Sequence, residues 1–486
     1  MKRFLAFGLL LCLPQPSLAR SRVVPTPPPV VLPAPPPDPL AVRPVPGPAL
    51  PLVPPTPEAS ALVNTVPLWV ISSSTLPIFT VVLDVPRGSD LDAAGHEGVA
   101  ALAMEAMRHG AGAWSGPAFA AEVERRGLQI EGSAGPDGSR LILSGPSDQL
   151  AVGLDLLADL VMRPNLESGE IKKSRDLLLA GLEQSFAEPA YVAERTANAL
   201  YWGADHPYGR PADGTASGLA KATDREVRQW HKAAWHAGGA TFTAAGDVTT
   251  ASLAPLLNAR FGRWRAGKLK PVLVPEAPVH AAEPLYLVDA PDSAQTGFYV
   301  AFPGLKLGAE AAVPTQIGTI ALGGTFTSRL NALLREKRGY TYGVRAGLSS
   351  ARAGGTLVVR TRIRTDVTAP ALVDLLGELD GIRKGITAEE LGKAQGAARQ
   401  DVVEALETQA GTAALFASYL TLGRPAASVA TELTALAAAT VDSVSPAMAA
   451  WNQDQAVFVL VGDRKLIEPA LLQAGFANLK VVTPLQ

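Results

Sequence analysis

Glu105 and His109 are the two side chains whose type and spacing could most directly bind a metal ion. They lie four positions apart, so both would project from one face of a helix, and His96 or Glu183 could complete a set of ligands. The alternative is structural. Glu105 and His109 would then form an (i, i+4) pair, with a protonated His109 near the negative end of the helix dipole. The pattern favours the structural interpretation.

The remaining histidines offer weaker candidates for chemistry. His231 and His236 are five apart, which on a helix separates them by more than about 90°, so they would chelate poorly. His206 lies in the segment His-Pro-Tyr-Gly-Arg-Pro, where proline and glycine indicate a shaped loop, and we interpret it as structural. No glycine-rich phosphate loop and no Gly-x-Ser-x-Gly elbow is present, so other enzyme classes gain no support.

Strand and helix patterns after residue 57 predict the elements that would position these side chains. Residues 68–72 and 79–85 have the composition of strands, and residues 97–109 that of a helix. A second helix is expected to begin at Ser115-Gly116-Pro117 and to run to Arg126. Clear capping boxes are expected to be sparse, so these boundaries are loose.

The second half of the chain repeats the first at a nearly constant offset. Pro303 follows Pro86 by 217 positions and Gly339 follows Gly127 by 212, and the other matching landmarks keep the same step. Arg126-Gly127 and Arg338-Gly339 should each end a helix, because glycine tolerates the left-handed conformation there. We therefore predict an α+β fold of two homologous domains, residues 58–267 and 268–486, which a proline-containing stretch at 268–284 joins.

The first 57 residues have the composition of an export signal and a linker. Lys2 and Arg3, an apolar run and Ser17-Leu18-Ala19 predict a signal peptide over residues 1–19. Residues 20–57 are rich in proline and are predicted to be an extended linker or tether. The only cysteine, Cys12, lies within the signal, so the mature chain would form no disulfide. We expect an exported protein, periplasmic or at the cell surface.

Charge and composition exclude some classes of partner. Apolar residues make up 47% of the 486 residues and charged residues 18%, which is typical of a globular chain of two or more domains. The formal charge is −2, and no basic stripe or nucleic-acid-binding motif is present. Nucleic acid is therefore not an expected partner.

Four segments together resemble the insulinase/pitrilysin family of zinc peptidases, which includes the mitochondrial processing peptidases and small two-domain bacterial members. The first half contributes His206 to Pro211 with Gly214-Thr215, and then Gly246-Asp247-Val248. The second half contributes Leu322-Gly323-Gly324 with Ser328-Arg329-Leu330, and Leu334-Arg335-Glu336-Lys337 with Gly339-Tyr340-Thr341-Tyr342. The resemblance spans roughly residues 60 to 480 and implies two domains, each a mainly antiparallel sheet packed with helices.

The resemblance implies a zinc site that this chain has lost. Members of the family hold zinc with His-x-x-Glu-His on a helix and a downstream Glu. Ala101, Met104 and Glu105 occupy the motif positions here, and Gly181 occupies the downstream position. No histidine lies between residues 97 and 108 in any alignment. We therefore expect no metal ligand set and no zinc in this chain.

The resemblance also implies a substrate-binding pair that is kept. An Arg and a Tyr seven residues apart in the second domain hold the peptide backbone and the developing oxyanion in the family, and they correspond to Arg335 and Tyr342. The alternative is that Arg335 is a solvated helix residue and that Tyr342 packs in the sheet.

These features predict a non-catalytic subunit that pairs with a zinc-bearing homologue and binds peptide substrate in a shared chamber. A second hypothesis is a scaffold that keeps the peptidase fold for assembly, as the core subunits of the respiratory cytochrome reductase do. A third hypothesis, a stand-alone peptidase with unusual ligands, would require near-stoichiometric zinc in the purified chain.

Overall fold

A computed structural model describes residues 47, 51–267 and 274–484. The predicted signal peptide 1–19, with Cys12, lies outside the described residues, as does most of the predicted linker 20–57. Regular structure begins at Glu58, directly after that linker.

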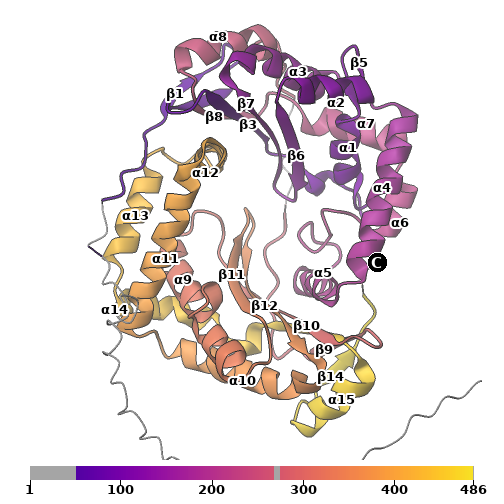
Figure 1. Ribbon diagram of the computed structural model, residues 1–486. Helices are drawn as coiled ribbons and strands as arrows, with labels where there is room; N and C mark the ends of the chain where they lie inside the picture. Colours follow the sequence, from indigo (N-terminus) through magenta and orange to yellow (C-terminus); the bar gives the residue numbers. More distant parts are fainter. Residues whose placement is uncertain (1–46, 48–50, 268–273, 485–486) are drawn as a thin grey trace, which may run out of the picture. The chain divides into compact units, whose positions relative to one another are not determined.

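The first sheet has six strands in the order β1-β2-β8-β3-β7-β6 (Figure 1). Strands β2 and β8 are parallel and the other pairs are antiparallel. The strand bounds are β1 (Glu58–Ala61), β2 (Pro67–Ser72), β3 (Ile78–Val85), β6 (Gln129–Gly135), β7 (Gly138–Pro146) and β8 (Thr241–Gly246).

The helices and the short hairpin that follow these strands pack on the first sheet or extend from it. They are α1 (Val99–Met107), α2 (Gly116–Arg125), α3 (Leu150–Met162), α4 (Ser168–Phe186), α6 (Ala216–Lys221), α7 (Asp224–Ala234) and α8 (Thr250–Phe261), with the two-stranded hairpin β4 (Gly110–Ala111) and β5 (Trp114–Ser115). The predicted helices over 97–109 and from Ser115 to Arg126 are thus α1 and α2, and both are confirmed.

The second sheet repeats this arrangement in the order β11-β12-β10-β13-β9-β14. Its strands are β9 (Leu285–Asp289), β10 (Gln295–Pro303), β11 (Val344–Ser350), β12 (Gly355–Arg364), β13 (Val457–Gly462) and β14 (Leu479–Val481). Its helical segments are α9 (Ala312–Thr319), α10 (Thr368–Arg383), α11 (Ala388–Glu407), α13 (Ser428–Ala438), α14 (Val441–Val444) and α15 (Arg464–Gln473), with two π-helical segments, Ile320–Gly324 and Asn331–Lys337.

The predicted duplication is confirmed by strand order. Five strands of each sheet follow the same path, β2-β8-β3-β7-β6 and β9-β13-β10-β12-β11, with the same parallel pair at one side. Gly127 and Gly339 each follow a helical segment with φ of 62° and 63°, which explains why both repeats need glycine there. The boundary near residue 268 stays a prediction, because residues 268–273 lie outside the described part of the chain.

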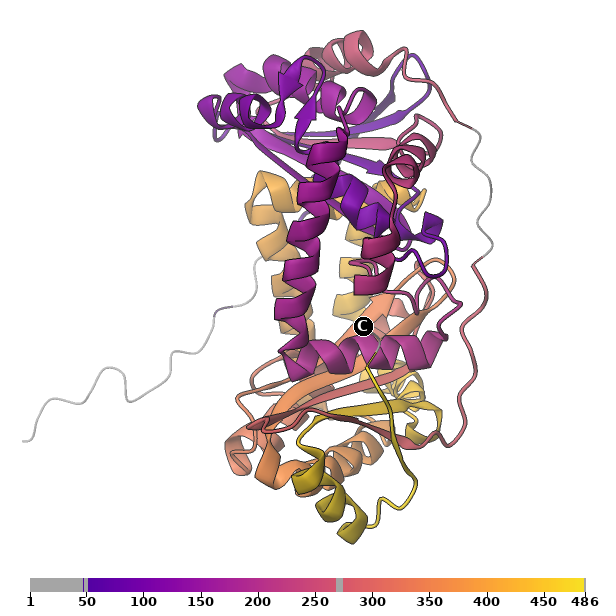
Figure 2. The ribbon, with the colours of Figure 1, turned by 90° about the vertical axis from the view of Figure 1, so that its right-hand side faces the viewer.

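Each sheet is covered on its second face by a helix from the other half. Helix α5 (Pro189–Trp202) packs on β10 and β13, and helix α12 (Gln409–Thr421) packs on β3 and β8. In Figure 2, α4 leads away from the first sheet into α5, which crosses the second sheet. Buried side chains of α12, led by Phe416, share an apolar cluster with Trp69 and Val82 of the first sheet. The two halves therefore exchange one helix each.

The expectation of sparse capping boxes is wrong. Within residues 51–267 and 274–484, four helices begin with one, at Thr223, Thr249, Thr387 and Thr440. In two of them the third helical residue is serine in place of the usual Glu or Gln, and its hydroxyl accepts from the N-cap backbone. A search for Glu alone would overlook these.

No single helix in the described ranges is long and apolar enough to cross a bilayer. The segments Ser428–Ala438 and Val441–Ala450 reach that length and apolar composition only when they are taken together, and a bend of 118° separates them.

Phe416→Ala tests the helix exchange. Its ring is fully buried, so removing it should lower the free energy of unfolding by about 3–5 kcal/mol. Chemical denaturation measures the change. Leu177→Ala, at an exposed position on α4, is the control and should stay within about 0.5 kcal/mol of the unmodified protein. Equal effects of the two substitutions would contradict the exchange.

Helix α1 is held at its N-terminus by a buried carboxyl. Asp92 is 5% exposed and accepts hydrogen bonds from the backbone N–H groups of Gly98 and Ala100, each at 2.9 Å. Burial raises the pKa of Asp92 to about 7, against the opposing effect of these two hydrogen bonds. In the folded chain this group therefore binds a proton over a pH range where the unfolded chain has lost it.

Asp92→Asn should flatten the pH dependence of stability. Because the folded-state pKa of Asp92 lies above its ordinary value of 3.8, its contribution favours folding below about pH 4 and is lost as pH rises to about 7. Urea denaturation from pH 4 to 8 measures the free energy of unfolding of both proteins. The value for the unmodified protein minus that for Asp92→Asn should fall as the pH rises. Asp176→Asn, which removes an exposed carboxyl, is the control, and an equal slope for the two variants would refute the assignment.

Candidate functional site

The positions that hold zinc in the resembled family are filled here by groups that cannot form a ligand set. Ala101 offers no donor, and Met104 is 5% exposed, with its terminal methyl packed close to Gly132 of β6. Glu105 points to its helix neighbour: its carboxylate lies 3.1 Å from Nε2 of His109. The structural interpretation of the Glu105–His109 pair is therefore the one that fits.

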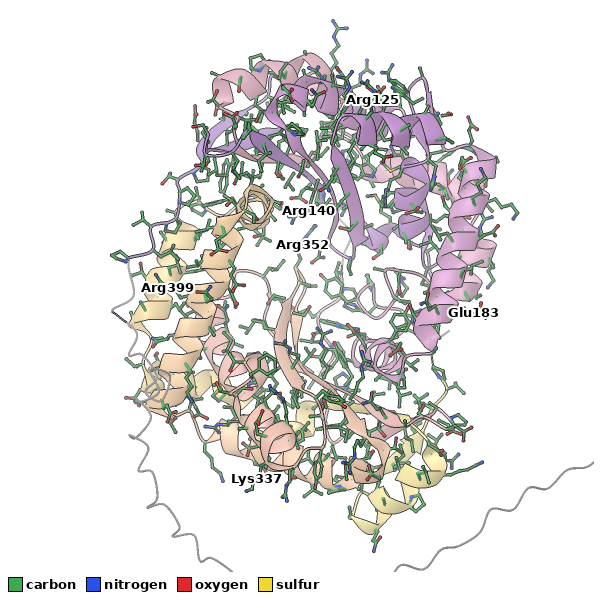
Figure 3. All side chains as sticks on the ribbon, viewed as in Figure 1. Arg125, Arg140, Glu183, Lys337, Arg352 and Arg399 are labelled. Carbon is green, nitrogen blue, oxygen red and sulfur yellow. The ribbon has the colours of Figure 1, made fainter. Side chains whose placement is uncertain are left out.

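The other predicted ligands lie elsewhere. Gly181 is an exposed position on α4 and has no side chain, and Glu183 is exposed on the same helix (Figure 3). His96 pairs instead with Glu226, its Nδ1 lying 3.0 Å from the carboxylate. In the ranges that the structure describes, no group of three or more His, Cys, Asp or Glu side chains could hold a metal ion. These residues do not fit a zinc site, which needs about three protein ligands.

The remaining histidines have structural partners. His231 contacts the Val161 carbonyl oxygen at 2.9 Å through Nε2, and Nδ1 of His236 accepts from the Gly238 N–H at 3.1 Å. His206 stacks on Trp202, and its Nδ1 accepts from the backbone N–H of Tyr208. These contacts of His206 hold the conformation of its own loop and so fix the position of Tyr208.

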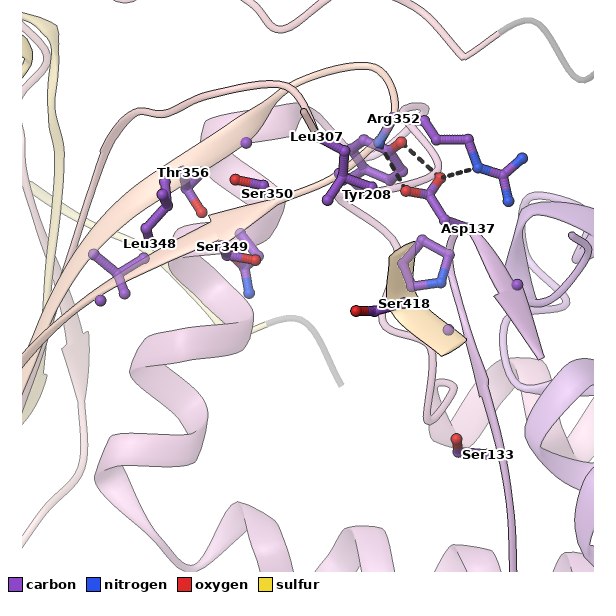
Figure 4. A pocket seen from close by; sticks show the side chains of 18 of the residues that line it. Ser133, Asp137, Tyr208, Leu307, Leu348, Ser349, Ser350, Arg352, Thr356 and Ser418 are labelled. Carbon is purple, nitrogen blue, oxygen red and sulfur yellow. Dashed lines mark hydrogen bonds and ion pairs between the residues drawn. The ribbon is translucent and has the colours of Figure 1, made fainter. Parts of the chain in front are cut away.

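A cavity of about 870 Å³ lies between strands of the two sheets, and charged and hydroxyl side chains line it beside apolar ones. The edge strands β6 and β11 both line it, through Ser133 and Gly135 on one side and residues 345–350 on the other. Figure 4 shows Ser349, Ser350 and Thr356 of the second sheet, with Ser418 of α12 and Ser133 of β6. An edge strand leaves one row of backbone N–H and C=O groups unpaired by its own sheet.

Charged groups within the cavity are largely paired. Arg140 donates to both carboxylate oxygens of Asp84, at 2.7 and 2.9 Å, and the Thr421 hydroxyl donates to the same carboxylate at 3.1 Å. Thr421 ends α12, so the exchanged helix from the second half contacts a charge of the first sheet. Arg140 and Arg352 are labelled at the centre of Figure 3.

The tips of two hairpins meet at one side of this cavity, and we call the contact the Asp137 clasp. Tyr208 donates its hydroxyl to Asp137 at 2.7 Å, and the backbone N–H of Arg352 donates to the other carboxylate oxygen at 2.8 Å (Figure 4). The Ala353 N–H donates to the Tyr208 oxygen at 3.1 Å. Burial raises the pKa of Tyr208 to about 12, so the phenol keeps its proton and remains a donor.

Arg335 lies on the π-helical segment Asn331–Lys337, and Tyr342 lies in the turn that leads from this segment into β11. The Arg335 guanidinium sits over the ring of Phe326, 4.5 Å from its centroid, and the Tyr342 side chain is 90% exposed. The alternative that Tyr342 packs in the sheet is wrong. The Asn331 side chain donates to the Val344 carbonyl and accepts from the Val344 N–H, which fixes the start of β11 and leaves Tyr342 outside it. Neither residue lines the cavity, and no hydrogen bond joins them in the described structure.

Sequence reasoning missed the charged residues of the cavity. One signal was available: β12 carries Arg360, Arg362 and Arg364 at every second position, which on a strand places all three on one face. Residues at the alternate positions of β12, such as Val359 and Ile363, are buried in the core of the second half.

Two domain families match the sequence. Residues 69–211 match the family described as insulinase (peptidase family M16), and residues 221–397 match the one described as peptidase M16 inactive domain. An uncharacterized zinc protease of Mycobacterium bovis is 28% identical over 262 residues, which cover 53% of this chain and 59% of the relative. A similar protein of Bacillus subtilis is 24% identical, with 52% and 61% covered. The matched region thus spans about three fifths of these relatives.

Solved structures share the fold at lower sequence identity. A peptidase M16 inactive domain of Pseudomonas fluorescens superposes with a TM-score of 0.78 at 22% identity, covering 84% of this chain and 98% of that one. A protease of Helicobacter pylori gives 0.77 at 18%, with 84% and 99% covered, and a chain of complex III2 from Candida albicans gives 0.72 at 14%, with 86% and 99% covered. By its two matched domains and its duplicated fold, the chain belongs to the insulinase/pitrilysin family of peptidases.

Proposed function

We propose that this chain is a non-catalytic subunit that pairs with a zinc-bearing homologue and helps to bind that enzyme's peptide substrate. One observation carries the proposal. Ala101, Met104 and Glu105 replace the zinc-binding side chains, whereas Arg335 and Tyr342 are kept in the second half and a cavity is kept between the two sheets. Loss of the metal site with retention of substrate-binding features is typical of a division of labour between two chains.

The two edge strands support peptide binding. An extended peptide can pair with the unpaired backbone groups of β6 or β11, since both strands end their sheets and both line the cavity. Backbone pairing of this kind is tolerant of peptide sequence, which suits a subunit that holds varied substrates.

Arg335 and Tyr342 supply the donors that a peptide carbonyl or an oxyanion on a partner's zinc would need. A guanidinium and a phenol both donate hydrogen bonds, and preorganised donors stabilise developing negative charge. Phe326 holds the Arg335 guanidinium by a cation–π contact, which limits the freedom of that side chain. Tyr342 is free to approach a second chain, because 90% of its surface is exposed.

We also propose that the pair works outside the cytoplasm. Residues 1–19 have the three regions of a signal peptide, and the proline-rich residues 20–57 would hold the folded part away from a membrane or a partner.

Arg335→Ala and Tyr342→Phe test the shared site. The chain is co-expressed with a zinc-bearing homologue of the same organism, and the complex is purified through a tag on this chain. Each substitution should lower kcat/KM for peptide cleavage by about 10²–10³-fold, as loss of an oxyanion donor does elsewhere. The metal remains in the partner, so its zinc content should not change.

Matched controls lie close by, at the end of the π-helical segment and in the turn that follows it. Arg338→Ala removes a guanidinium that is paired with Asp374, at 2.9 Å, and Tyr340→Phe removes a hydroxyl from a half-buried ring. Both should leave cleavage unchanged. Full activity of Arg335→Ala and Tyr342→Phe in a stable complex would reject the shared site and favour the scaffold hypothesis, in which only the fold is used for assembly.

A further inference from the structure

Three side chains form a row across the cavity-facing side of the second sheet. Tyr299 of β10 lies opposite Arg360 of β12, and Arg360 lies opposite Arg345 of β11. All three line the cavity. Directly opposed residues in antiparallel strands have their Cβ atoms about 4.5–5.5 Å apart, so the two arginines start from neighbouring positions on one face.

Pairing of charges leaves Arg345 uncompensated. In the part of the chain that the structure describes, the cavity lining has one more arginine than carboxylate: Arg140, Arg345, Arg352 and Arg360 against Asp84, Asp137 and Glu194. Arg140 pairs with Asp84, Arg352 lies 3.9 Å from Asp137, and Arg360 lies 3.7 Å from Glu194. No hydrogen bond or ion pair in the described residues joins Arg345 to a carboxylate.

Of these two opposed arginines, only Arg360 has a carboxylate partner, and its contact with Glu194 is loose, at 3.7 Å. Like charges directly opposite each other on a sheet are unfavourable, and the Arg360 side chain is 58% exposed, so water rather than protein satisfies much of its charge. A carboxylate that entered between Arg345 and Arg360 would relieve this repulsion. It could accept parallel hydrogen bonds from a planar guanidinium, a geometry that arginine is suited to provide.

The next two pairs of opposed residues on this face could accommodate an extended peptide beside the two arginines. Gly347 lies opposite Val358 in the next row on the same face, and Ser349 lies opposite Thr356 in the row after it. From Arg345 to Ser349 the strand advances about 13 Å, at about 3.3 Å per residue. The cavity therefore has room for about four residues of an extended peptide. Its lining is positively charged at one end, has small side chains in the middle and carries hydroxyl groups at the other end.

We propose that this cavity selects peptides that carry a carboxylate side chain, and that the carboxylate binds between Arg345 and Arg360. The inference rests on the proposed peptide-binding function and specifies its substrate class as acidic peptide segments.

The test compares two labelled peptides on the purified full chain. Each is short, rich in Val, Thr and Ser, blocked at both ends and carries a fluorescent label without charge. One has a single central Asp, and the other has Asn at that position. Fluorescence anisotropy should give the Asp peptide a Kd about tenfold lower or better, since a charge-assisted hydrogen bond is lost in the Asn peptide. The difference should shrink as salt is added.

Arg345→Gln should abolish most of this preference, and Arg362→Gln is its matched control. Arg362 carries the same charge on the same strand and face as Arg360, but it pairs with Glu188 at 3.2 Å and does not line the cavity. Arg345 is exposed, so its substitution should leave the thermal unfolding midpoint unchanged.

Three results would overturn the carboxylate site: equal binding of the two peptides, equal loss of preference in both variants, or no binding of either peptide. The proposed function is tested separately, by the effect of Arg335→Ala on cleavage by the complex. If Arg335→Ala still lowers cleavage by the complex, the shared-site proposal stands without the acidic preference. If Arg335→Ala has no effect and neither peptide binds, both proposals fall.

Discussion

The burial of each sheet's second face by a helix from the other half is the constraint on which the rest of the structure depends. Val82 and Trp69 of the first sheet are covered by α12, and Tyr286 and Val459 of the second sheet lie in one apolar cluster with residues of α5. A sheet with two apolar faces must bury both, and in each half the helix that covers the second face comes from the other half. The two halves are thus joined by the hydrophobic effect, at two separate places.

This exchange also creates the candidate site. Helix α12 ends at Thr421 beside Asp84, and α5 carries Glu194 to Arg360, so each exchanged helix brings polar groups to the cavity at its border. The Asp137 clasp joins the hairpins of the two edge strands at their tips. Both β6 and β11 end their sheets, so each has a row of backbone groups that its own sheet leaves unpaired.

Local patterns in the sequence predicted helices and strands, but they did not predict contacts between residues far apart in the chain. The repeat, the turns at Gly127 and Gly339 and the absence of zinc ligands around Ala101 can each be derived from a few neighbouring residues. The helix exchange could not, because the apolar face of α12 is the same whichever sheet it covers. Nor could the position of Arg345 directly opposite Arg360 on the neighbouring strand, since it depends on strand register. For Tyr342, the family resemblance supplied a role that periodicity alone would not suggest.

Peptide cleavage by the two chains, separately and mixed, with zinc determined for each, tests the division of labour most directly. If the two chains divide the work, this chain alone should bind far less than one zinc per molecule and cleave nothing, and the mixture should cleave more than the zinc-bearing homologue alone. Cleavage by this chain alone with stoichiometric zinc would contradict this division of labour, as would a mixture no more active than the homologue by itself.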